Sequence, residues 1–134
     1  MSFELDPCLA ADTVQVTDWP LCKVLLMNDA NYPWLVLVPR VAGAVNLHDL
    51  DAGQAAGLME ESRRASSLLA QVTGSEKTNV ATLGNLVPQL HIHVIARFQS
   101  DPAWPGPVWG RVPAEPYADQ ALEARLEELR RAFG

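Results

Sequence analysis

Alternating hydrophobic and polar positions mark five short segments of the chain as strands. In an extended strand successive side chains point to opposite faces, so a period of two is typical of a sheet with one buried face. The segments are residues 13–17, 22–27, 34–38, 78–83 and 90–98. Turn-forming residues separate the second segment from the third and the fourth from the fifth. This arrangement predicts two hairpins.

Helical spacing of apolar positions predicts two helices, and a capping pattern predicts a third. Residues 49–72 carry an apolar stripe of the right period, with Asp49 or Asp51 able to cap its start and Gly74 suited to its end. Residues 117–133 repeat the pattern, with acidic residues early and arginines late, as the helix dipole favours. Asp6 followed by Pro7 predicts a short helix over residues 7–11.

The order of these elements predicts an α+β fold. Hairpin, helix and hairpin give a mostly antiparallel sheet of about five strands, with the long central helix on one face, a C-terminal helix, and the opposite face free for a ligand. Residues 101–116 begin with three prolines, two glycines and two tryptophans in ten positions, which predicts a loop. We expect a single domain over residues 1–134, with its core in residues 13–98.

Composition and charge narrow the possible partners. Ten Lys and Arg residues against sixteen Asp and Glu give a formal net charge of −6, which argues against a nucleic-acid-coating surface. No cationic leader and no apolar run of about 18–20 residues is present, so we expect a cytoplasmic protein with no membrane partner. Cys8 and Cys22 match no disulfide or metal pattern, and both are expected to be buried small hydrophobes.

The last predicted strand also carries candidate chemistry. Two of the chain's three histidines alternate there with branched aliphatic residues. The aliphatic side chains would face the core, whereas Gln89, His91 and His93 would share the opposite face. Because histidine titrates near physiological pH, two imidazoles and an amide in one row suggest a reactive surface.

The residues alone leave three interpretations of this row open. The histidines could be ordinary half-exposed strand residues. They could bind a metal, although a zinc site needs three or four ligands, and His48, which is otherwise expected to be structural, and a carboxylate would have to complete it. One imidazole could instead attack phosphorus as a nucleophile while the other stabilises the developing charge.

The segment Pro-Gln-Leu-His-Ile-His-Val-Ile at residues 88–95 resembles the signature of the histidine triad (HIT) family, with Gln89 at the first histidine position. The hairpin over residues 22–40, residues 46–50 at the helix entry and the strand from residue 78 resemble the same family. The resemblance covers about residues 22–98, and it implies the HIT-like fold.

The resemblance also implies an activity. Family members are nucleotide hydrolases and transferases acting at the α-phosphate of purine nucleotide conjugates or dinucleoside polyphosphates, without a cofactor, commonly as homodimers. By position His91 would be the nucleophile that forms a nucleotidyl-histidine intermediate, and His93 would bind the phosphate. Gln89 keeps hydrogen bonding but cannot carry positive charge. The alternatives are a nucleotide-binding or sensor module with little turnover and a metal-dependent hydrolase, whereas no metal is expected in the leading interpretation.

The family's leading hairpin implies a nucleoside site. By position Asp29 would hold the ribose hydroxyls with Asn28 beside it, and Leu26 and Met27 would lie near the base. Turn chemistry alone could also explain Asp29, because Asn and Asp favour such positions for backbone hydrogen bonding.

Further residues have weaker expectations. Asn85, with Asn79 in reserve, matches the family's phosphate-contacting asparagine by position. Trp104 and Trp109 are expected to pack within the loop or at a dimer contact, and their aromatic faces could form a lid over the pocket. Arg97 could reach a phosphate but is expected to be a solvated strand end.

Overall fold

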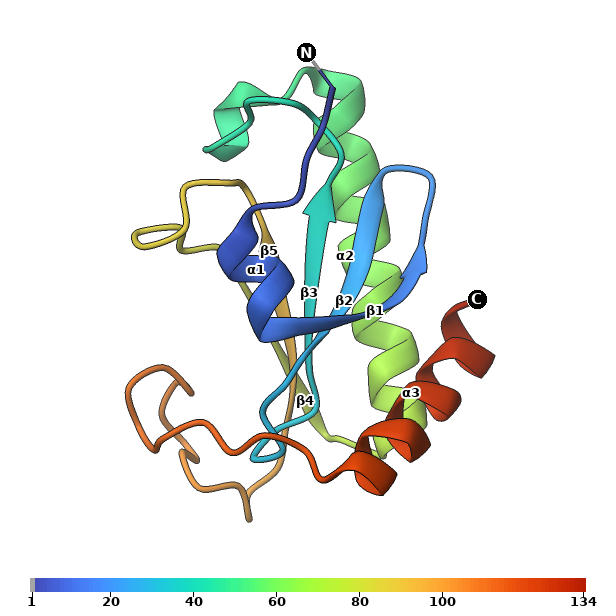
Figure 1. Ribbon diagram of the computed structural model, residues 1–134, viewed down its shortest axis with the longest axis vertical. Helices are drawn as coiled ribbons and strands as arrows, with labels where there is room; N and C mark the ends of the chain where they lie inside the picture. The colour runs from blue at the N-terminus through green and yellow to red at the C-terminus, as the bar shows by residue number, and fades with distance from the viewer. Residues whose placement is uncertain (1) are drawn as a thin grey trace.

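A computed structural model describes residues 2–134, which form a sheet between two layers of helix and loop (Figure 1). In chain order the elements are α1 (Pro7–Asp12), β1 (Thr13–Asp18), β2 (Cys22–Met27), β3 (Trp34–Pro39), the 3-10 helix η1 (Leu47–Asp49), α2 (Ala52–Thr73), β4 (Lys77–Ala81), β5 (Ile92–Arg97) and α3 (Asp119–Phe133). The predicted elements are therefore present in the predicted order.

The sheet has five strands in the order β1-β2-β3-β5-β4, and every neighbouring pair is antiparallel. Strands β2 and β3 form the first predicted hairpin, and β4 and β5 form the second. Pairing of β3 with β5 joins the hairpins, with Val36 opposite His93. The α+β prediction of a mostly antiparallel five-stranded sheet is confirmed.

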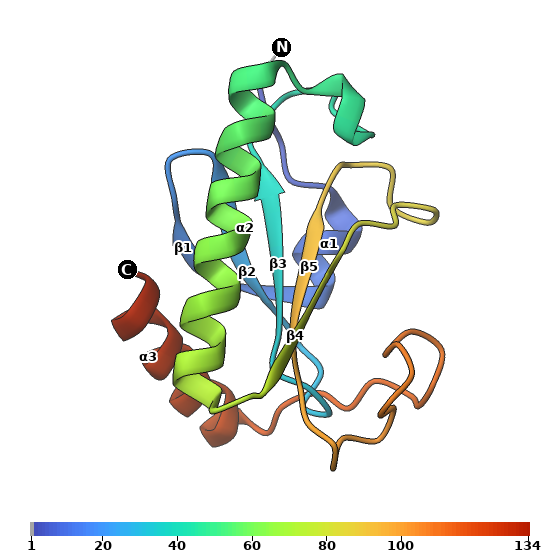
Figure 2. The same ribbon diagram turned by 180° about the vertical axis from the view of Figure 1, so that it is seen from behind.

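Helix α2 covers one face of this sheet along its length (Figure 2). Asp51 caps its start by accepting a hydrogen bond from the Gln54 N–H at 2.8 Å, and Gly74 ends it in a left-handed conformation with φ 73°. Asp49 instead caps η1, where its carboxylate accepts from the N–H groups of Val45 and Asn46. Of the two caps that the sequence allowed, Asp51 is the one used by α2.

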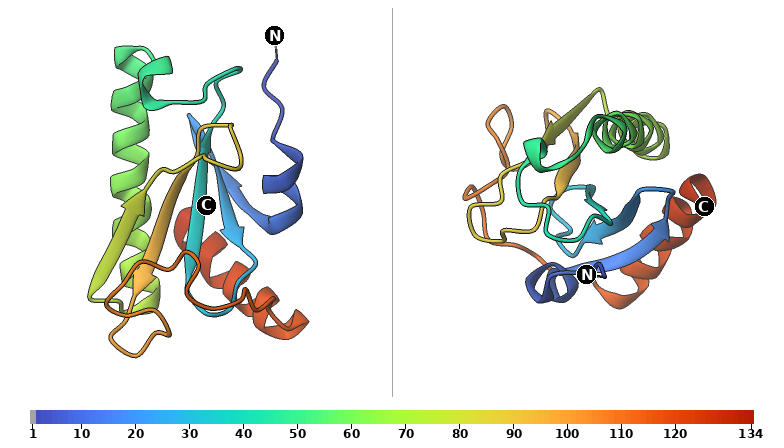
Figure 3. Two further views of the ribbon diagram at one scale, coloured as in Figure 1. Left: turned by 90° about the vertical axis from the view of Figure 1, so that its left-hand side faces the viewer. Right: turned by 90° about the horizontal axis from the view of Figure 1, so that it is seen from above.

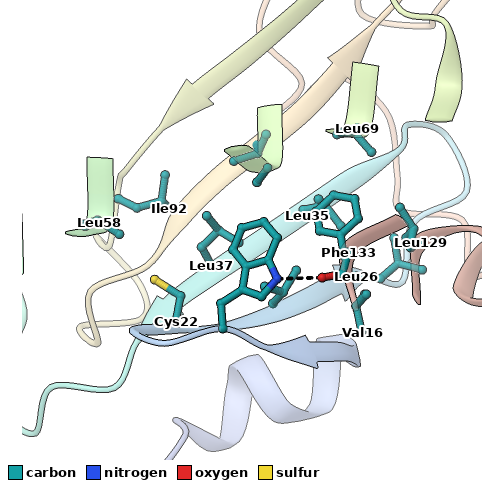
Figure 4. Close-up of a cluster of buried hydrophobic side chains, with 14 of the residues drawn as sticks. Val16, Cys22, Leu26, Leu35, Leu37, Leu58, Leu69, Ile92, Leu129 and Phe133 are labelled. Carbon is teal, nitrogen blue, oxygen red and sulfur yellow. Dashed lines mark hydrogen bonds between the residues drawn. The ribbon is translucent and has the colours of Figure 1, made fainter. Parts of the chain in front are cut away.

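Helix α3 packs on the same face as α2, where Leu129 and Phe133 lie beside Val16 and Leu26 (Figure 4). The Phe133 ring stacks on Trp19 with centroids 5.4 Å apart, and the Trp19 indole N–H donates to the Phe133 carbonyl at 2.9 Å. This contact buries the end of α3 against the start of the sheet and completes the main core.

The other face of the sheet is only partly open. Helix α1 and the N-terminal segment lie on this face, opposite α2 (Figure 3). Leu9 of α1 and Val108 of the Pro- and Trp-rich loop pack there against Trp34, Val36 and other strand residues. The face that the sequence left free for a ligand is therefore flanked by α1 with the N-terminal segment and by the Pro- and Trp-rich loop. The strand pattern did not indicate the positions of these two segments.

Strand boundaries differ from the predictions mainly around the connection between β4 and β5. The strand predicted over residues 78–83 is β4, Lys77–Ala81, and ends earlier than predicted. The strand predicted over residues 90–98 is β5, Ile92–Arg97, and begins later than predicted. Leu90 leaves the ladder because its N–H donates to the Ala44 carbonyl at 3.0 Å. The connection is thus longer than the sequence suggested, and its residues become available to line a cavity.

None of the helices within residues 2–134 combines the length and the apolar character needed to cross a membrane.

Candidate functional site

The two signature histidines lie on the sheet face opposite α2. Strand alternation sends Ile92 and Val94 into the main core, while His93 and Ile95 point to the other side. His91 and His93 are each 5% exposed, and their ring centroids are 4.9 Å apart. The structure therefore brings the two imidazoles together, as the sequence predicted, but in a far more buried setting than a strand surface.

A backbone hydrogen bond fixes the tautomer of His91. Its Nδ1 lies 2.7 Å from the carbonyl oxygen of Gln89. A carbonyl can only accept, so Nδ1 must carry the proton. In the neutral ring the lone pair is then on Nε2, which is the atom left for attack on an electrophile.

A side-chain hydrogen bond fixes the opposite tautomer in His93. The indole N–H of Trp34 donates to His93 Nδ1 at 3.0 Å. Because the indole N–H is only a donor, Nδ1 is the unprotonated nitrogen and the ring proton is on Nε2. Burial, together with the neighbouring His91, lowers the pKa of His93 to about 4. At neutral pH His93 is therefore an uncharged donor.

Aromatic rings enclose His93. Trp34 lies 5.6 Å and Trp109 5.1 Å from it between centroids, both edge to face, and the two indoles are 5.8 Å apart. Edge-to-face contacts of this kind hold rings in fixed orientation. Trp109 comes from the Pro- and Trp-rich loop, so this loop supplies part of the site.

The histidines open into a cavity of about 440 Å³. Its far side is formed by the connection between β4 and β5, including Asn85, and by Leu9 and Asp12 of α1. Its lining residues are Leu9, Asp12, Met27, Trp34, Leu83, Gly84, Asn85, Leu86, Val87, His91, His93 and Trp109. Most of these side chains are apolar, and among the described residues no Lys or Arg lines this cavity.

A second cavity of about 460 Å³ adjoins the first and shares Asp12, Met27, Trp34 and Trp109 with it. Asn28 and Asp29 also line it. The two cavities together form one elongated site, with the imidazoles at one end and the turn after β2 at the other. The expected nucleoside residues Met27, Asn28 and Asp29 and the expected phosphate residue Asn85 all lie in this site.

Asp29 makes the turn contacts that the sequence suggested and also lines the second cavity. Its Oδ1 accepts from the Asn31 N–H at 3.0 Å, which is turn chemistry, and from the Glu115 N–H at 3.2 Å. Its Oδ2 has no hydrogen bond to the described residues, although the side chain lines the second cavity. Asn28 Oδ1 accepts from the Tyr117 N–H at 2.9 Å. These two side chains therefore hold the end of the Pro- and Trp-rich loop as well as facing the cavity.

Gln89 lies on the same face as the histidines, as expected, because Leu90 packs in the main core with Ile92 and Val94, but its side chain does not line the cavity of the histidines. Gln89 precedes the first residue of β5, and its side-chain amide bonds to the backbone of Glu4 and Asp6. It lines a separate cavity of about 300 Å³ beside the N-terminal segment. The side chain stays out of the cavity of the histidines because its amide bonds to the backbone of the N-terminal segment on this face.

Three other expected site residues lie elsewhere. Leu26 is fully buried in the core beneath α2, because it is one residue out of phase with Met27. Asn79 accepts a hydrogen bond from the guanidinium of Arg97 at 2.7 Å and lines neither cavity of the site. Trp104 packs over the same guanidinium, with 5.7 Å between the guanidinium carbon and the ring centroid, and lines neither cavity of the site.

Arg97 is not a solvated strand end, since it is 2% exposed. Its guanidinium forms an ion pair with Asp101 at 2.8 Å and donates to the Gly106 carbonyl at 2.8 Å. Burial opposes ionisation of Asp101, but hydrogen bonds from Arg97 and from the N–H groups of Phe98 and Ala103 keep its pKa below the ordinary value. Arg97 therefore anchors the loop that carries Trp109.

The cysteines and the third histidine have no part in the site. Cys22 is buried as expected, but Cys8 is exposed on α1, because it faces away from the apolar contact that Leu9 makes. The His48 side chain is 83% exposed on η1. Within residues 2–134, no three His, Cys, Asp or Glu side chains gather closely enough to hold a metal ion.

Sequence reasoning missed three members of the site. Trp34 was assigned only to a strand, yet it orients His93; its diagonal position across the β3–β5 ladder could have suggested the contact. Leu9 and Asp12 come from a short helix that no local pattern connects to the signature. Their contribution depends on how the N-terminal segment crosses the sheet.

Comparisons with known proteins agree with this fold. The HIT domain matches residues 9–100, so the chain belongs to the histidine triad family. A histidine triad protein from Bradyrhizobium japonicum is 46% identical, with a TM-score of 0.97 and all of both chains covered. One from Marinobacter aquaeolei is 45% identical, with a TM-score of 0.95 and 98% and 96% of the chains covered.

A more distant structure shares the fold alone. A hypothetical histidine triad nucleotide-binding protein from Sulfolobus tokodaii is 15% identical, with a TM-score of 0.70, over 90% of this chain and 83% of the other. No curated protein matches the chain.

Proposed function

We propose that the protein is a nucleotide hydrolase or transferase that acts at the α-phosphate of a purine nucleotide conjugate through a nucleotidyl-histidine intermediate. The observation that carries the proposal is the pair of opposite tautomers in adjacent imidazoles. His91 presents a lone pair on Nε2, and His93 presents an N–H on Nε2, beside the same cavity. Membership of the histidine triad family supports this class of activity.

In the first step Nε2 of His91 attacks the α-phosphorus. A P–N bond forms, the bond from phosphorus to the leaving group breaks, and its electron pair departs with the leaving group, which takes a proton from solvent. The imidazole becomes positively charged, and the Gln89 carbonyl that accepts from Nδ1 at 2.7 Å stabilises this charge. Water then attacks phosphorus and breaks the P–N bond, which releases the nucleoside monophosphate and regenerates His91.

His93 would stabilise the transferring phosphoryl group by hydrogen bonding. Its Nε2–H is a neutral donor, and the low pKa means that it stays neutral across the physiological range. A neutral donor can contact either a non-bridging or a leaving oxygen without losing its proton. The role requires a fixed ring, which Trp34 and Trp109 provide.

The adjoining cavity suits a nucleoside. Met27 and Trp109 offer apolar surface for a base, and Asp29 offers a carboxylate oxygen free to accept from ribose hydroxyls. The relative from Sulfolobus tokodaii is described as nucleotide-binding, which supports the same ligand class here.

The leaving-group end of the site is apolar. Leu83, Leu86 and Val87 line it, and Leu86 is 96% exposed. The polyphosphate chain of a dinucleoside polyphosphate would need basic side chains nearby to balance its negative charge. Among the described residues no Lys or Arg lines either cavity. We therefore favour phosphoramidates and acyl adenylates over dinucleoside polyphosphates within the proposed substrate range.

The test is to mix the protein with adenosine phosphoramidate, an acyl adenylate or a diadenosine polyphosphate, quench in acid-free denaturant, and measure intact mass. We expect a nucleotidyl adduct that disappears in His91→Ala. Turnover or an adduct that persists in His91→Ala would contradict the nucleophile assignment. Binding of AMP without adduct or turnover in the natural protein would favour the nucleotide-binding or sensor alternative.

We also propose that the protein forms a homodimer through the β4 edge of the sheet. An unpaired edge strand tends to associate, and Val80 on β4 and Met59 on α2 are 50% and 71% exposed beside an apolar groove of about 360 Å³. Light scattering after chromatography should give twice the chain mass, and Val80→Lys should give the monomer. A monomeric natural protein would contradict the proposal.

A further inference from the structure

Gln89 stands at the position where the family signature has its first histidine, and its side chain makes two long-range hydrogen bonds. The Asp6 N–H donates to Gln89 Oε1 at 2.8 Å, and Gln89 Nε2 donates to the Glu4 carbonyl at 2.8 Å. Both ends of the amide are therefore occupied by the backbone of one segment, more than eighty residues away along the chain.

The geometry of these bonds matches an amide better than an imidazole. A carbonyl and an N–H two residues apart project from the same edge of an extended segment. The oxygen and nitrogen of a carboxamide point in nearly the same direction, so one side chain can accept from one group and donate to the other. The two nitrogens of histidine point away from each other and cannot do both.

The segment that Gln89 holds continues into the wall of the site. Asp6 caps α1 by accepting from the Cys8 N–H at 2.8 Å, and α1 supplies Leu9 and Asp12 to the cavity that contains the histidines. The far end of the segment is also attached, because the Asp12 carbonyl accepts from the Asn28 N–H at 2.9 Å. Gln89 thus provides a hydrogen-bonded attachment near the start of the segment, in addition to the apolar packing of Leu9.

Gln89 also contacts the nucleophile from the other side. Its backbone carbonyl accepts from His91 Nδ1 at 2.7 Å. One residue therefore links the orientation of the attacking imidazole to the position of the N-terminal segment. Substitution of the side chain leaves the carbonyl bond possible and removes only the link to the segment.

We propose that Gln89 is a positioning residue, which holds residues 3–12 against the sheet and so completes the wall of the nucleotide site. This inference rests on the proposed function. It gives the first signature position a role in ligand affinity rather than in phosphoryl transfer. Conversion of Gln89 to the family's histidine should therefore weaken ligand binding and leave the chemical step without a large gain.

The test uses three variants of the full chain. Gln89→Ala removes both side-chain bonds, Gln89→Glu keeps the shape and the acceptor but loses the donor to Glu4, and Gln89→His installs the signature residue. Gln71→Ala is the matched control, because Gln71 also donates a side-chain hydrogen bond, to Ser67 at 3.2 Å, on exposed surface of α2.

Three measurements are made on each variant: amide hydrogen exchange of residues 3–12, the affinity for AMP, and the kinetics of adenosine phosphoramidate hydrolysis. We expect faster exchange of the Asp6 amide and its neighbours in Gln89→Ala and Gln89→His, and a smaller increase in Gln89→Glu, which keeps the acceptor for the Asp6 N–H. We expect the AMP Kd and the KM to rise about tenfold in Gln89→Ala, the effect of losing one or two ordinary hydrogen bonds. The kcat should stay within about threefold, because the Gln89 carbonyl still orients His91.

Several results would overturn the inference. Unchanged exchange in Gln89→Ala would show that the amide does not hold the segment, and faster exchange with unchanged Kd would show that the segment is not part of the ligand wall. A large rise of kcat in Gln89→His would assign the position to the chemical step. If the natural protein neither binds AMP nor forms an adduct, the proposed function fails, and hydrogen exchange alone then decides whether Gln89 holds the segment.

Discussion

The indole N–H of Trp34 donates a buried hydrogen bond to His93 Nδ1 at 3.0 Å, and this bond fixes the tautomer of His93. It places the ring proton on Nε2 and opposes a second proton, since an imidazolium has no acceptor to offer the indole. The other imidazole, His91, has the reverse arrangement because it donates from Nδ1 to a carbonyl. Two identical side chains thus acquire different chemistry from their neighbours.

Loss of the indole donor should raise the pKa of His93. In Trp34→Phe the neutral ring loses its hydrogen bond and water can approach, and both changes favour the charged form. We expect the pKa to move from about 4 toward the ordinary 6.5. A histidine ring NMR titration measures it, with Trp104→Phe as a control because Trp104 contacts Arg97 and lines neither cavity. An unchanged pKa would show that burial and the neighbouring His91 set it without the indole.

The low pKa of His93 makes the free energy of unfolding depend on pH. The folded protein keeps His93 neutral down to about pH 4, whereas the unfolded chain binds a proton near 6.5. The free energy of unfolding is therefore not reduced by His93 above about pH 6.5. As the pH decreases toward about 4, protonation of His93 in the unfolded chain lowers it by about 3 kcal/mol. Urea denaturation at several pH values measures the slope, and His93→Asn, which keeps an acceptor for Trp34, should make it shallower.

Substitution of Arg97 should destabilise the fold strongly. Arg97→Met would leave the Asp101 carboxylate buried without its cation, a change that costs about 3–5 kcal/mol in comparable buried pairs. Urea denaturation measures the loss. Arg63→Met is the control, because Arg63 forms an ion pair with Glu60 on exposed surface, and we expect little change there. Equal effects of the two substitutions would argue against a special role for the buried pair.

Substitution of the two tryptophans of the Pro- and Trp-rich loop should have different effects, one on AMP affinity and the other on stability. Trp109→Leu should weaken AMP binding by about three- to tenfold, since Trp109 lines both cavities and contacts His93. Trp104→Leu should lower the unfolding midpoint and leave AMP affinity nearly unchanged, because Trp104 packs on Arg97. Calorimetric titration and thermal melts distinguish these outcomes, and equal losses of affinity would contradict the assignment.

The two cysteines should differ sharply in reactivity. Cys8 is exposed, whereas Cys22 is buried, and burial with the nearby Glu61 carboxylate raises the pKa of the Cys22 thiol far above its ordinary value. A thiol reagent at pH 8 should therefore modify one thiol in the native protein and two in urea. Rapid modification of both in the native state would indicate that the β2 end of the core opens readily.

The sequence by itself determined the parts of the fold that depend on local period. Strand alternation and helical spacing located every main element, because each buries one face and repeats accordingly. The alternation around residue 92 correctly assigned His91 and His93 to the face opposite α2. The resemblance to the family's leading hairpin pointed to Asn28 and Asp29, which line the second cavity.

Only the tertiary structure decided the contacts between residues far apart in the chain. No local pattern could show that Gln89 bonds to residues 4 and 6, that Arg97 is buried against Asp101, or that Trp34 orients His93. Each depends on which segments cross the sheet and on where polar groups find partners once water is excluded. The row of polar residues was visible in the sequence, but packing decided that His91 donates from Nδ1, that His93 accepts at Nδ1, and that Gln89 bonds to the N-terminal backbone.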